Sequence, residues 1–488
     1  MSTTGTTTID LLIGGRDVPA GGGRRFARAN PISGTVVTQA AAATLEDADA
    51  AVAAAQAAFP AWSALSPGER RQRLLKAADL MDAHTGDFIA IGAAEIGGMP
   101  NWYGFNAMLA ANMLREAAAM TTQINGEVIP TNIPGNMALA LRQPCGVVLG
   151  IAPWNAPVIL GTRAIATPLA CGNTVVLKAS EQCPATHRLI GSILTQAGLG
   201  DGVVNVITND PADAPAIVER LVANPAVRRV NFTGSTGVGR IVAQLAAKHL
   251  KPALLELGGK APLLVLHDAD LDAAVDAAAF GGFFNQGQIC MSTERLVVDS
   301  RVADAFVDKL AAKARTLKAG DPAAEGSVLG ALVNTQAGQR IKALLDDAVA
   351  KGASLAAGGS IDGAIMQATV VDGVTPEMKL YAEESFGPVV AVIRVDGDED
   401  AIRVANDSDY GLSAAVFSRD VARALTVAQR IDSGICHING PTVHDEAQMP
   451  FGGVKSSGYG RFGGKWGVAE FTELRWVTIQ TGPRHYPI

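Results

Sequence analysis

The chain has 488 residues, of which 48% are hydrophobic and 18% are charged. This length predicts two to four domains, and the apolar fraction excludes an intrinsically disordered protein. The formal net charge of -7 argues against a protein that binds nucleic-acid phosphates, which would carry a basic face. No apolar run is as long as a membrane span and the polar N-terminus lacks the layout of a signal peptide, so we expect a cytoplasmic protein.

The predicted elements alternate between helices and strands. The Ala-rich stretch 41–58 and the stretch 67–92 predict two helices. Short apolar runs then predict buried strands, separated by helical patterns at 158–171, at 184–197 and from 237 onward. These strands are 147–151, 174–178, 203–207 and 228–232, followed by a second series at 253–256, 262–265, 295–298 and 389–393. Such alternation predicts an α/β fold with doubly wound parallel sheets, in which ligands bind at the carboxyl ends of the strands.

The cysteines and histidines do not suggest a metal site. The number of cysteines is odd, and no two of them form a C-x-x-C pair. The sequence therefore suggests neither a disulfide framework nor a thiolate zinc site. They are Cys145, Cys171, Cys183, Cys290 and Cys436. The seven histidines form no ligand cluster, and we interpret His437 and His444 as structural. We therefore expect no metal, and ask whether one thiol is reactive.

Two segments have the character of a dinucleotide site. The turn 232–239 (FTGSTGVG) follows a strand and precedes a helix, which places backbone N–H groups and a helix N-terminus against a phosphate. Its spacing differs from the usual G-x-G-x-x-G, so an ordinary tight turn stays open. Glu181, three residues after Lys178, is placed to accept hydrogen bonds from ribose hydroxyls, although a solvated charge pair is the commoner interpretation of this pattern.

Three further residues carry reactive or polarising groups. Glu256 ends an apolar strand, where burial is costly unless the carboxylate is paired or functional. Cys290 follows a polar turn, 285–289 (NQGQI), and most cysteines in such surroundings are buried structural thiols. Asn155 ends another strand and is either a turn residue or a donor aimed at a developing oxyanion.

Together and in this order, these segments resemble the aldehyde dehydrogenase superfamily. The matching segments are 153–155 (PWN), 178–181 (KASE), 232–239, 256–260 (ELGGK), 284–290 (FNQGQIC), 384–388 (ESFGP) and 450–455 (PFGGVK). The resemblance covers most of the chain. It implies the aldehyde dehydrogenase fold, with a Rossmann-like NAD-binding domain (1–123 and 143–255), an α/β catalytic domain (256–455) and a small β oligomerisation element (124–142 and 470–488).

The resemblance also implies the chemistry. Cys290 is the expected nucleophile, although a free cysteine has a pKa of about 8.5 and the site must generate the thiolate. Asn155 and the Cys290 backbone N–H are expected to hold the oxyanion, and loss of hydride to a nicotinamide leaves a thioester. Glu256 is the expected general base for its hydrolysis. Relatives that pass the acyl group to CoA generally lack this glutamate.

The same resemblance implies the cofactor contacts. Glu384 and Phe386 are expected at the nicotinamide and its ribose, Ser235 at the pyrophosphate, and Lys178 and Glu181 at the adenosine ribose. Because Glu181 would repel a 2'-phosphate, we expect NAD, with NADP as the alternative. The other expected cofactor contacts are Ile151, Pro153, Trp154, Ser180, Gly234, Val238, Gly239 and Leu257.

The substrate is less strongly specified. Segments 151–181 and 434–451 resemble bacterial dehydrogenases of aromatic aldehydes, those acting on salicylaldehyde first, then those acting on vanillin and benzaldehyde. Trp102 is expected to border the substrate tunnel, where an aromatic wall suits a flat ring, although core packing is an equal alternative. Arg163 is placed to pair with a phenolate or the product carboxylate, while a salt bridge within the fold is the commoner interpretation. Ile289, Met291 and Phe451 complete the expected pocket.

The same residues bear on other possible functions and on the assembly. A dehydrogenase of aliphatic aldehydes or semialdehydes would share every catalytic residue, whereas a non-enzymatic scaffold would not need Cys290, Glu256 and Asn155 together. The stretch 476–480 alternates like an edge strand and has no obvious partner nearby. With 124–142, the terminal strand 473–480 matches the family's element for pairing between subunits, so we expect a homodimer or a dimer of dimers.

Overall fold

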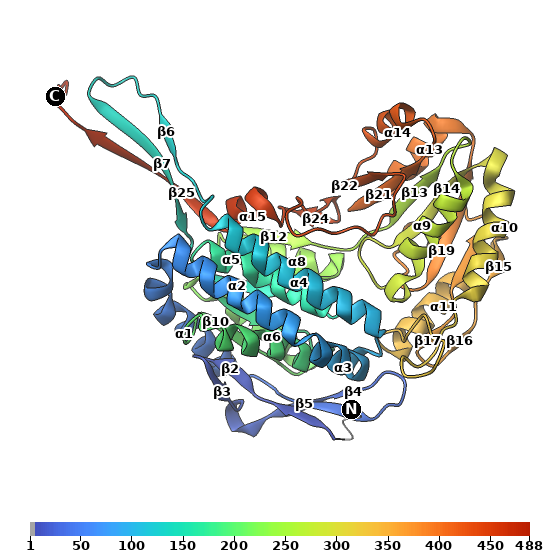
Figure 1. Ribbon diagram of the computed structural model, residues 1–488, viewed down its shortest axis with the longest axis horizontal. Coiled ribbons are helices and arrows are strands. Elements are labelled where there is room, and N and C mark those ends of the chain that lie inside the picture. The colour runs from blue at the N-terminus through green and yellow to red at the C-terminus, as the bar shows by residue number, and fades with distance from the viewer. Residues whose placement is uncertain (1–4) are drawn as a thin grey trace.

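The computed structural model describes residues 5–488, so most of the N-terminal stretch used against a signal peptide lies outside the described residues. Figure 1 shows two lobes and a projecting arm. The first lobe is coloured from blue to green and the second is mainly yellow to orange. No helix within the described part of the chain is long and apolar enough to cross a membrane.

The first lobe is built on an eight-stranded sheet in the order β24-β12-β11-β8-β9-β10-β2-β3. Its central strands are parallel, as predicted. They are β8 (Val147–Ile151), β9 (Thr174–Lys178), β10 (Val204–Ile207), β11 (Val227–Thr233) and β12 (Ala253–Glu256). The antiparallel edges are β2 (Leu11–Ile13), β3 (Arg16–Val18) and β24 (Gly458–Tyr459). Every residue of β8, β9 and β10 is buried, because helices cover both faces of the sheet.

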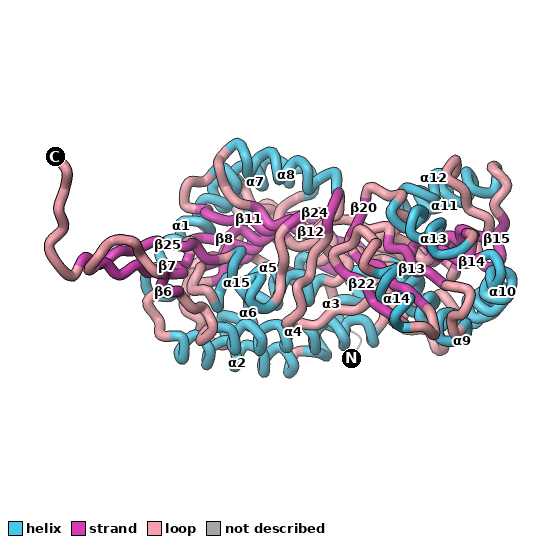
Figure 2. The backbone as a smooth tube through the Cα atoms, turned by 90° about the horizontal axis from the view of Figure 1, so that it is seen from above, coloured by secondary structure: helices cyan, strands magenta, loops and turns pink. Residues whose placement is uncertain are grey.

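Helices form a layer on each side of this sheet, and Figure 2 shows α7 and α8 on one side with α2 and α4 on the other. One core joins α1, α7 and α8 to the sheet, and a second core joins α2, α4, α5 and α6 to its opposite face. The helices are α1 (Leu45–Ser63), α2 (Pro67–Ala83), α3 (Thr85–Ile96), α4 (Pro100–Met120), α5 (Pro157–Ala170), α6 (Pro184–Gln196), α7 (Ala214–Ala223) and α8 (Thr236–Lys248).

The predicted bounds of two helices were wrong, and the first of them, predicted to end at residue 58, continues to Ser63. The first helix begins at Leu45, not at residue 41, because Thr44 and Asp47 form a capping box that starts it there. The stretch 67–92 is not one helix, since α2 ends at Ala83 and α3 begins at Thr85. The break lies at His84, whose backbone leaves the helical region (ψ 12°) and whose ring lies 2.6 Å from the Asp87 carboxylate in the first turn of α3.

The second lobe is built on a seven-stranded sheet in the order β15-β18-β19-β14-β13-β21-β22. All pairs except β15–β18 are parallel. The strands are β13 (Ala261–Val265), β14 (Thr293–Asp299), β15 (Ser354–Ala357), β18 (Thr369–Asp372), β19 (Val389–Val395), β21 (Ser413–Phe417) and β22 (Ile435–Ile438). One face is covered by α9 (Leu271–Phe283) and α10 (Ser300–Thr316), the other by α11 (Thr335–Ala350), α13 (Gly397–Asn406) and α14 (Val421–Ala428).

The arm is a three-stranded antiparallel sheet that projects from the first lobe, with the C-terminus near its tip (Figure 1). It consists of β6 (Glu127–Ile129), β7 (Asn136–Pro144) and β25 (Thr472–Gln480). The terminal strand has no partner nearby along the chain, as expected, but β25 pairs with β7 of its own chain along its whole length. A remote segment supplies this partner, which the alternation of the strand alone does not reveal. A further sheet near the N-terminus joins β1 (Thr7–Ile9), β4 (Arg25–Ala29) and β5 (Val36–Ala41).

We keep the division into NAD-binding, catalytic and oligomerisation parts as a proposal. The chain leaves the first sheet at Glu256, the last residue of β12, and returns to it at β24. The residues between these points form the second lobe, and the arm combines strands from both proposed oligomerisation segments.

Candidate active site

Two cavities meet at Cys290, on the side of the first sheet where its parallel strands end. One has a volume of about 460 Å³ and the other about 310 Å³. Both are lined by Asn155, Leu160 and Cys290. The thiol is therefore placed where two molecules can approach it from different directions.

The turn before Cys290 has an unusual backbone that side chains hold in place. Asn285, Gln286 and Gly287 all have positive φ (49°, 56° and 67°), which costs about 1–2 kcal/mol for each residue other than glycine. Asn285 Nδ2 donates to the Asn155 carbonyl at 3.0 Å, and Gln286 Nε2 donates to the Ala331 carbonyl at 3.1 Å. A Cβ at Gly287 would lie 2.0 Å from the Gly387 carbonyl oxygen, so the close approach requires glycine.

Asn155 and the Cys290 backbone can supply hydrogen-bond donors next to the thiol. Asn155 Nδ2 donates one hydrogen bond, to the Gln288 carbonyl at 3.0 Å, which leaves the second amide hydrogen available. Within residues 5–488 the Cys290 N–H has no hydrogen-bond partner. The indole of Trp102 donates to the Asn155 carbonyl at 3.0 Å and fixes this loop. This is the pair of donors that the family resemblance implies for an oxyanion.

Glu256 is a buried carboxyl group beside the thiol. It is 1% exposed, and neither of its oxygens has a hydrogen-bond partner among the described residues. Burial raises the Glu256 pKa to about 8, although the charge of Arg163 and the neighbouring Cys290 thiol lower it in part. Burial, and then the charge of Glu256, raise the pKa of the Cys290 thiol well above its usual value. The Cys290 thiol is therefore neutral near neutral pH. The Glu256 carboxyl group titrates close to neutral pH, as a general base requires.

The smaller cavity is bounded by a second carboxylate and an aromatic pair. Glu384 Oε1 accepts a hydrogen bond from the Gly259 N–H at 2.8 Å, and burial raises the Glu384 pKa to about 7. Phe386 has a left-handed backbone (φ 46°), and its N–H donates to the buried Glu294 carboxylate at 2.9 Å. The Phe386 ring meets the Trp154 ring edge-on at 5.7 Å.

The expected cofactor residues divide into two groups. Those that line the smaller cavity are Pro153, Trp154, Gly234, Ser235, Leu257, Glu384 and Phe386. Those outside its lining are Ile151, Lys178, Ser180, Glu181, Val238 and Gly239. The latter lie at or just after the carboxyl ends of β8 and β9 and in the first turn of α8, and the Ser180 N–H donates to His187 Nδ1 at 3.1 Å.

The segments of this second group have the local structure expected of a dinucleotide site. Ser235 caps α8 by accepting from the Val238 N–H, and a Cβ at Gly239 would lie 2.4 Å from the Leu257 side chain. Lys178 forms an ion pair with Glu181, whose carboxylate also accepts from Asn209 Nδ2 at 3.0 Å. The ion pair agrees with the charge-pair interpretation and leaves a ribose-binding role open.

The larger cavity has aromatic walls. All five expected pocket residues line it, namely Trp102, Arg163, Ile289, Met291 and Phe451. Sequence reasoning missed Phe105, Phe280 and Phe284 as pocket residues, although their spacing was a usable signal. Phe105 lies one helical turn after Trp102 and their rings stack at 5.8 Å, while Phe280 and Phe284 stack at 4.9 Å.

The contacts of Trp102 and Arg163 agree both with a place in the substrate pocket and with a structural role. Trp102 packs edge-on against Phe284 at 5.1 Å and also lines the cavity. Arg163 forms a salt bridge with Asp445, and its guanidinium lies 4.1 Å from the centre of the Phe451 ring. His444, expected to be structural, lines the same cavity and lies 2.9 Å from Glu446. Within the described residues no group of three potential metal ligands is found.

Comparison with known proteins agrees with the family resemblance and the predicted fold. A sequence profile described as "Aldehyde dehydrogenase family" matches residues 18–477. The chain is 72% identical to a vanillin dehydrogenase of Pseudomonas fluorescens, covering 98% of this chain and 99% of that protein. It is 52% identical to a salicylaldehyde dehydrogenase of Pseudomonas putida, covering 95% and 96%.

Among solved structures, it resembles a salicylaldehyde dehydrogenase from Pseudomonas putida G7 in complex with salicylaldehyde. The TM-score is 0.97 and the identity is 49%, covering 99% of this chain and 100% of that one. Both the predicted fold and the predicted family are thereby confirmed. The chain belongs to the aldehyde dehydrogenase family, and is an enzyme that oxidises aldehydes with NAD(P).

Proposed function

We propose that this enzyme uses NAD to oxidise an aromatic aldehyde to its carboxylic acid through a thioester on Cys290. The observation that carries the proposal is the meeting of two cavities at this thiol. One cavity has aromatic walls that suit a flat ring, and the other has the apolar and acidic lining that suits a nicotinamide ribose.

The first half of the reaction forms the thioester. The Cys290 thiol gives up its proton to solvent, and Sγ, now the thiolate, attacks the carbonyl carbon, so that the carbonyl oxygen becomes an alkoxide. The second Asn155 amide hydrogen and the Cys290 N–H donate to that oxygen. A bound nicotinamide supplies the hydride acceptor. Loss of hydride from the tetrahedral carbon restores the carbonyl and leaves the acyl group on Sγ.

The second half releases the acid. Glu256, with its pKa raised to about 8, removes a proton from a water molecule as that water attacks the thioester carbon. The resulting tetrahedral oxyanion again faces Asn155 and the Cys290 N–H. Its collapse expels the Cys290 thiolate and releases the carboxylic acid.

The cofactor fits the residues at the end of the smaller cavity. Ser235 and the N-terminus of α8 offer backbone N–H groups to a pyrophosphate, and Gly239 lets the first turn of that helix lie close to Leu257. Glu181 would hold the adenosine ribose. Its negative charge disfavours a 2'-phosphate, which supports NAD over NADP.

The identity of the ring aldehyde rests on the relatives. The sequence segments favour a salicylaldehyde-like substrate, and the similar solved structure holds salicylaldehyde. The higher identity to the vanillin dehydrogenase of Pseudomonas fluorescens favours vanillin as the second candidate. Both are hydroxylated benzaldehydes.

The test follows NADH absorbance with salicylaldehyde, vanillin, benzaldehyde and hexanal, for the wild type and for Cys290→Ala. Fast NADH formation with the ring aldehydes that the substitution abolishes is the expected result. Activity confined to hexanal would refute the aromatic substrate and keep the mechanism. Activity that survives in Cys290→Ala would refute the nucleophile.

We also propose a homodimer or dimer of dimers assembled through the arm. Trp476, Leu474 and Val128 on this sheet are 77%, 63% and 74% exposed, an unusual amount of apolar surface for an isolated chain. Light scattering should give the mass of two or four chains, and Trp476→Glu should lower it. A monomeric wild type would refute this assembly.

A further inference from the structure

Arg163 and Asp445 form a buried ion pair in the wall of the larger cavity. Their side chains are only 6% and 8% exposed. Most of the surrounding lining is apolar, including Phe105, Phe284 and Val443. Removing two charges from water is so costly that apolar residues of similar volume often stabilise a protein equally well. The pair is therefore poorly explained by stability alone.

Both side chains of this pair have hydrogen-bonding atoms without a partner among the described residues. Asp445 Oδ1 is buried and has no hydrogen-bond partner among residues 5–488. Arg163 makes one side-chain hydrogen bond, to Asp445 Oδ2, although a guanidinium has five N–H donors. The Cβ–Cγ torsion of Asp445 has broad preferences, so rotation about it changes the direction of the free oxygen without moving the backbone.

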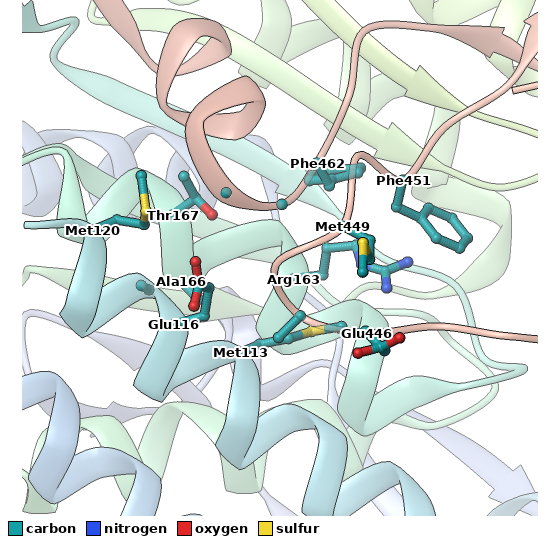
Figure 3. A pocket seen from close by; sticks show the side chains of 14 residues that line it. Met113, Glu116, Met120, Arg163, Ala166, Thr167, Glu446, Met449, Phe451 and Phe462 are labelled. Carbon is teal, nitrogen blue, oxygen red and sulfur yellow. The ribbon is translucent and has the colours of Figure 1, made fainter. Parts of the chain in front are cut away.

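The direction of Arg163 is consistent with a role in the larger cavity. Arg163 and Phe451 also line a much smaller pocket of about 20 Å³, whose far side is formed by residues that include Glu116 and Thr167. Figure 3 shows the guanidinium pointing towards Phe451 and away from Glu116 and Thr167. Neither of these residues forms a hydrogen bond with Arg163, so its remaining donors are not used on that side.

The position of Arg163 along α5 sets its distance from the reacting centre. Leu160 lines both cavities where they meet, whereas Arg163 lines the larger cavity and not the smaller one. Three residues of helix rise by about 4.5 Å, a distance comparable with the width of a benzene ring. An aromatic aldehyde with its carbonyl carbon at Cys290 would bring the far edge of its ring towards Arg163.

Resting on the aromatic substrate proposed above, and favouring its vanillin candidate over salicylaldehyde, we propose that Arg163 and Asp445 select ring aldehydes that carry a hydroxyl group opposite the aldehyde. An Arg163 N–H donates to the hydroxyl oxygen, and the hydroxyl donates to Asp445 Oδ1. A ring without this hydroxyl leaves both charged groups with unpaired hydrogen-bonding atoms. Sites of this kind reject analogues strongly, because the cost of unpaired buried polar groups adds to the lost hydrogen bond.

The test compares 4-hydroxybenzaldehyde with 4-methylbenzaldehyde, whose methyl group has a similar size and no hydrogen bond to offer. We expect the wild-type kcat/KM to be at least about 10-fold higher for the hydroxyl compound. The double variant Arg163→Met/Asp445→Leu removes both charges together, so that neither is left buried without its partner. Its ratio of the two kcat/KM values should fall to near one.

A matched control removes an exposed ion pair in α11 with the same substitutions, Lys342→Met/Asp346→Leu, and should keep the wild-type ratio. The single variant Asp445→Asn, which keeps the side-chain volume, should lower the ratio if the double variant does not fold. Because the ratio is measured within one protein, a general loss of activity cancels out. Salicylaldehyde, with its hydroxyl next to the aldehyde, should be much less sensitive to either change.

The outcomes separate this inference from the proposed function. A wild-type ratio near one, or a ratio that both variants leave unchanged, overturns the role of Arg163 and Asp445 while activity on ring aldehydes remains. Sensitivity of salicylaldehyde equal to that of 4-hydroxybenzaldehyde overturns the assigned ring position. If the wild type oxidises none of the ring aldehydes but oxidises hexanal, the aromatic function itself fails.

Discussion

Replacing Glu256 with glutamine should stabilise the enzyme, and the gain should depend on pH. Glutamine matches the volume of the carboxylic acid but cannot ionise. In the folded protein, burial raises the Glu256 pKa from 4.5 to about 8, so folding favours the neutral form. Ionisation of the Glu256 carboxyl group therefore destabilises the folded wild type, and it cannot occur in the variant.

The sign and size of the effect follow from proton linkage. Below pH 4.5 the group is protonated in both the folded and unfolded chain, and it makes no difference to stability. Between pH 4.5 and 8 the unfolded chain is ionised while the folded one stays protonated, so the wild type loses about 1.4 kcal/mol of folding free energy per pH unit. Above pH 8 the loss levels off, at about 5 kcal/mol at most. The Cys290 thiol stays neutral in this range because its own pKa is raised.

The assay is a series of thermal melts from pH 5.5 to 9 for the wild type, Glu256→Gln and a control, Glu219→Gln, at an exposed position of α7. The Tm of Glu256→Gln relative to the wild type should rise with pH up to about 8 and then stay level, while the control should follow the wild type. A difference that does not change with pH would refute the argument that burial raises this pKa. So would a variant that melts below the wild type at pH 9.

Three kinetic predictions follow from the same site. Glu256→Gln should release about one NADH per Cys290 in a rapid burst and then turn over at least about 10²-fold more slowly than the wild type. The absence of a burst in stopped-flow measurements would show that Glu256 acts before the thioester forms. Asn155→Ala should lower kcat by about 10²- to 10³-fold in steady-state assays, and a loss below about 10-fold would argue against its role at the oxyanion. Glu181→Gln should raise kcat/KM for NADP relative to NAD by about 10-fold, because it removes a negative charge near the 2'-phosphate. An unchanged ratio would show that Glu181 does not select the cofactor.

The sequence by itself determined the type and order of the main elements. The runs at 147–151 and 174–178 are apolar throughout, as strands covered on both faces must be, and the structure buries every residue of them. The order of Asn155, Glu256 and Cys290 within their motifs was enough to indicate the family. These signals are local, since strand and helix patterns depend on near neighbours, and the motifs are short stretches read directly from the chain.

Only the tertiary structure decided which of these local features meet. The two cavities that join at Cys290, the pairing of β25 with β7, and the contact between Arg163 and Asp445 all unite segments that lie far apart along the chain. The aromatic wall formed by Phe105 and Phe284 likewise depends on how α4 packs near the end of α9. Such contacts are set by the packing of whole layers, because a side chain's periodicity indicates which face of its element is buried but not which remote residue covers that face.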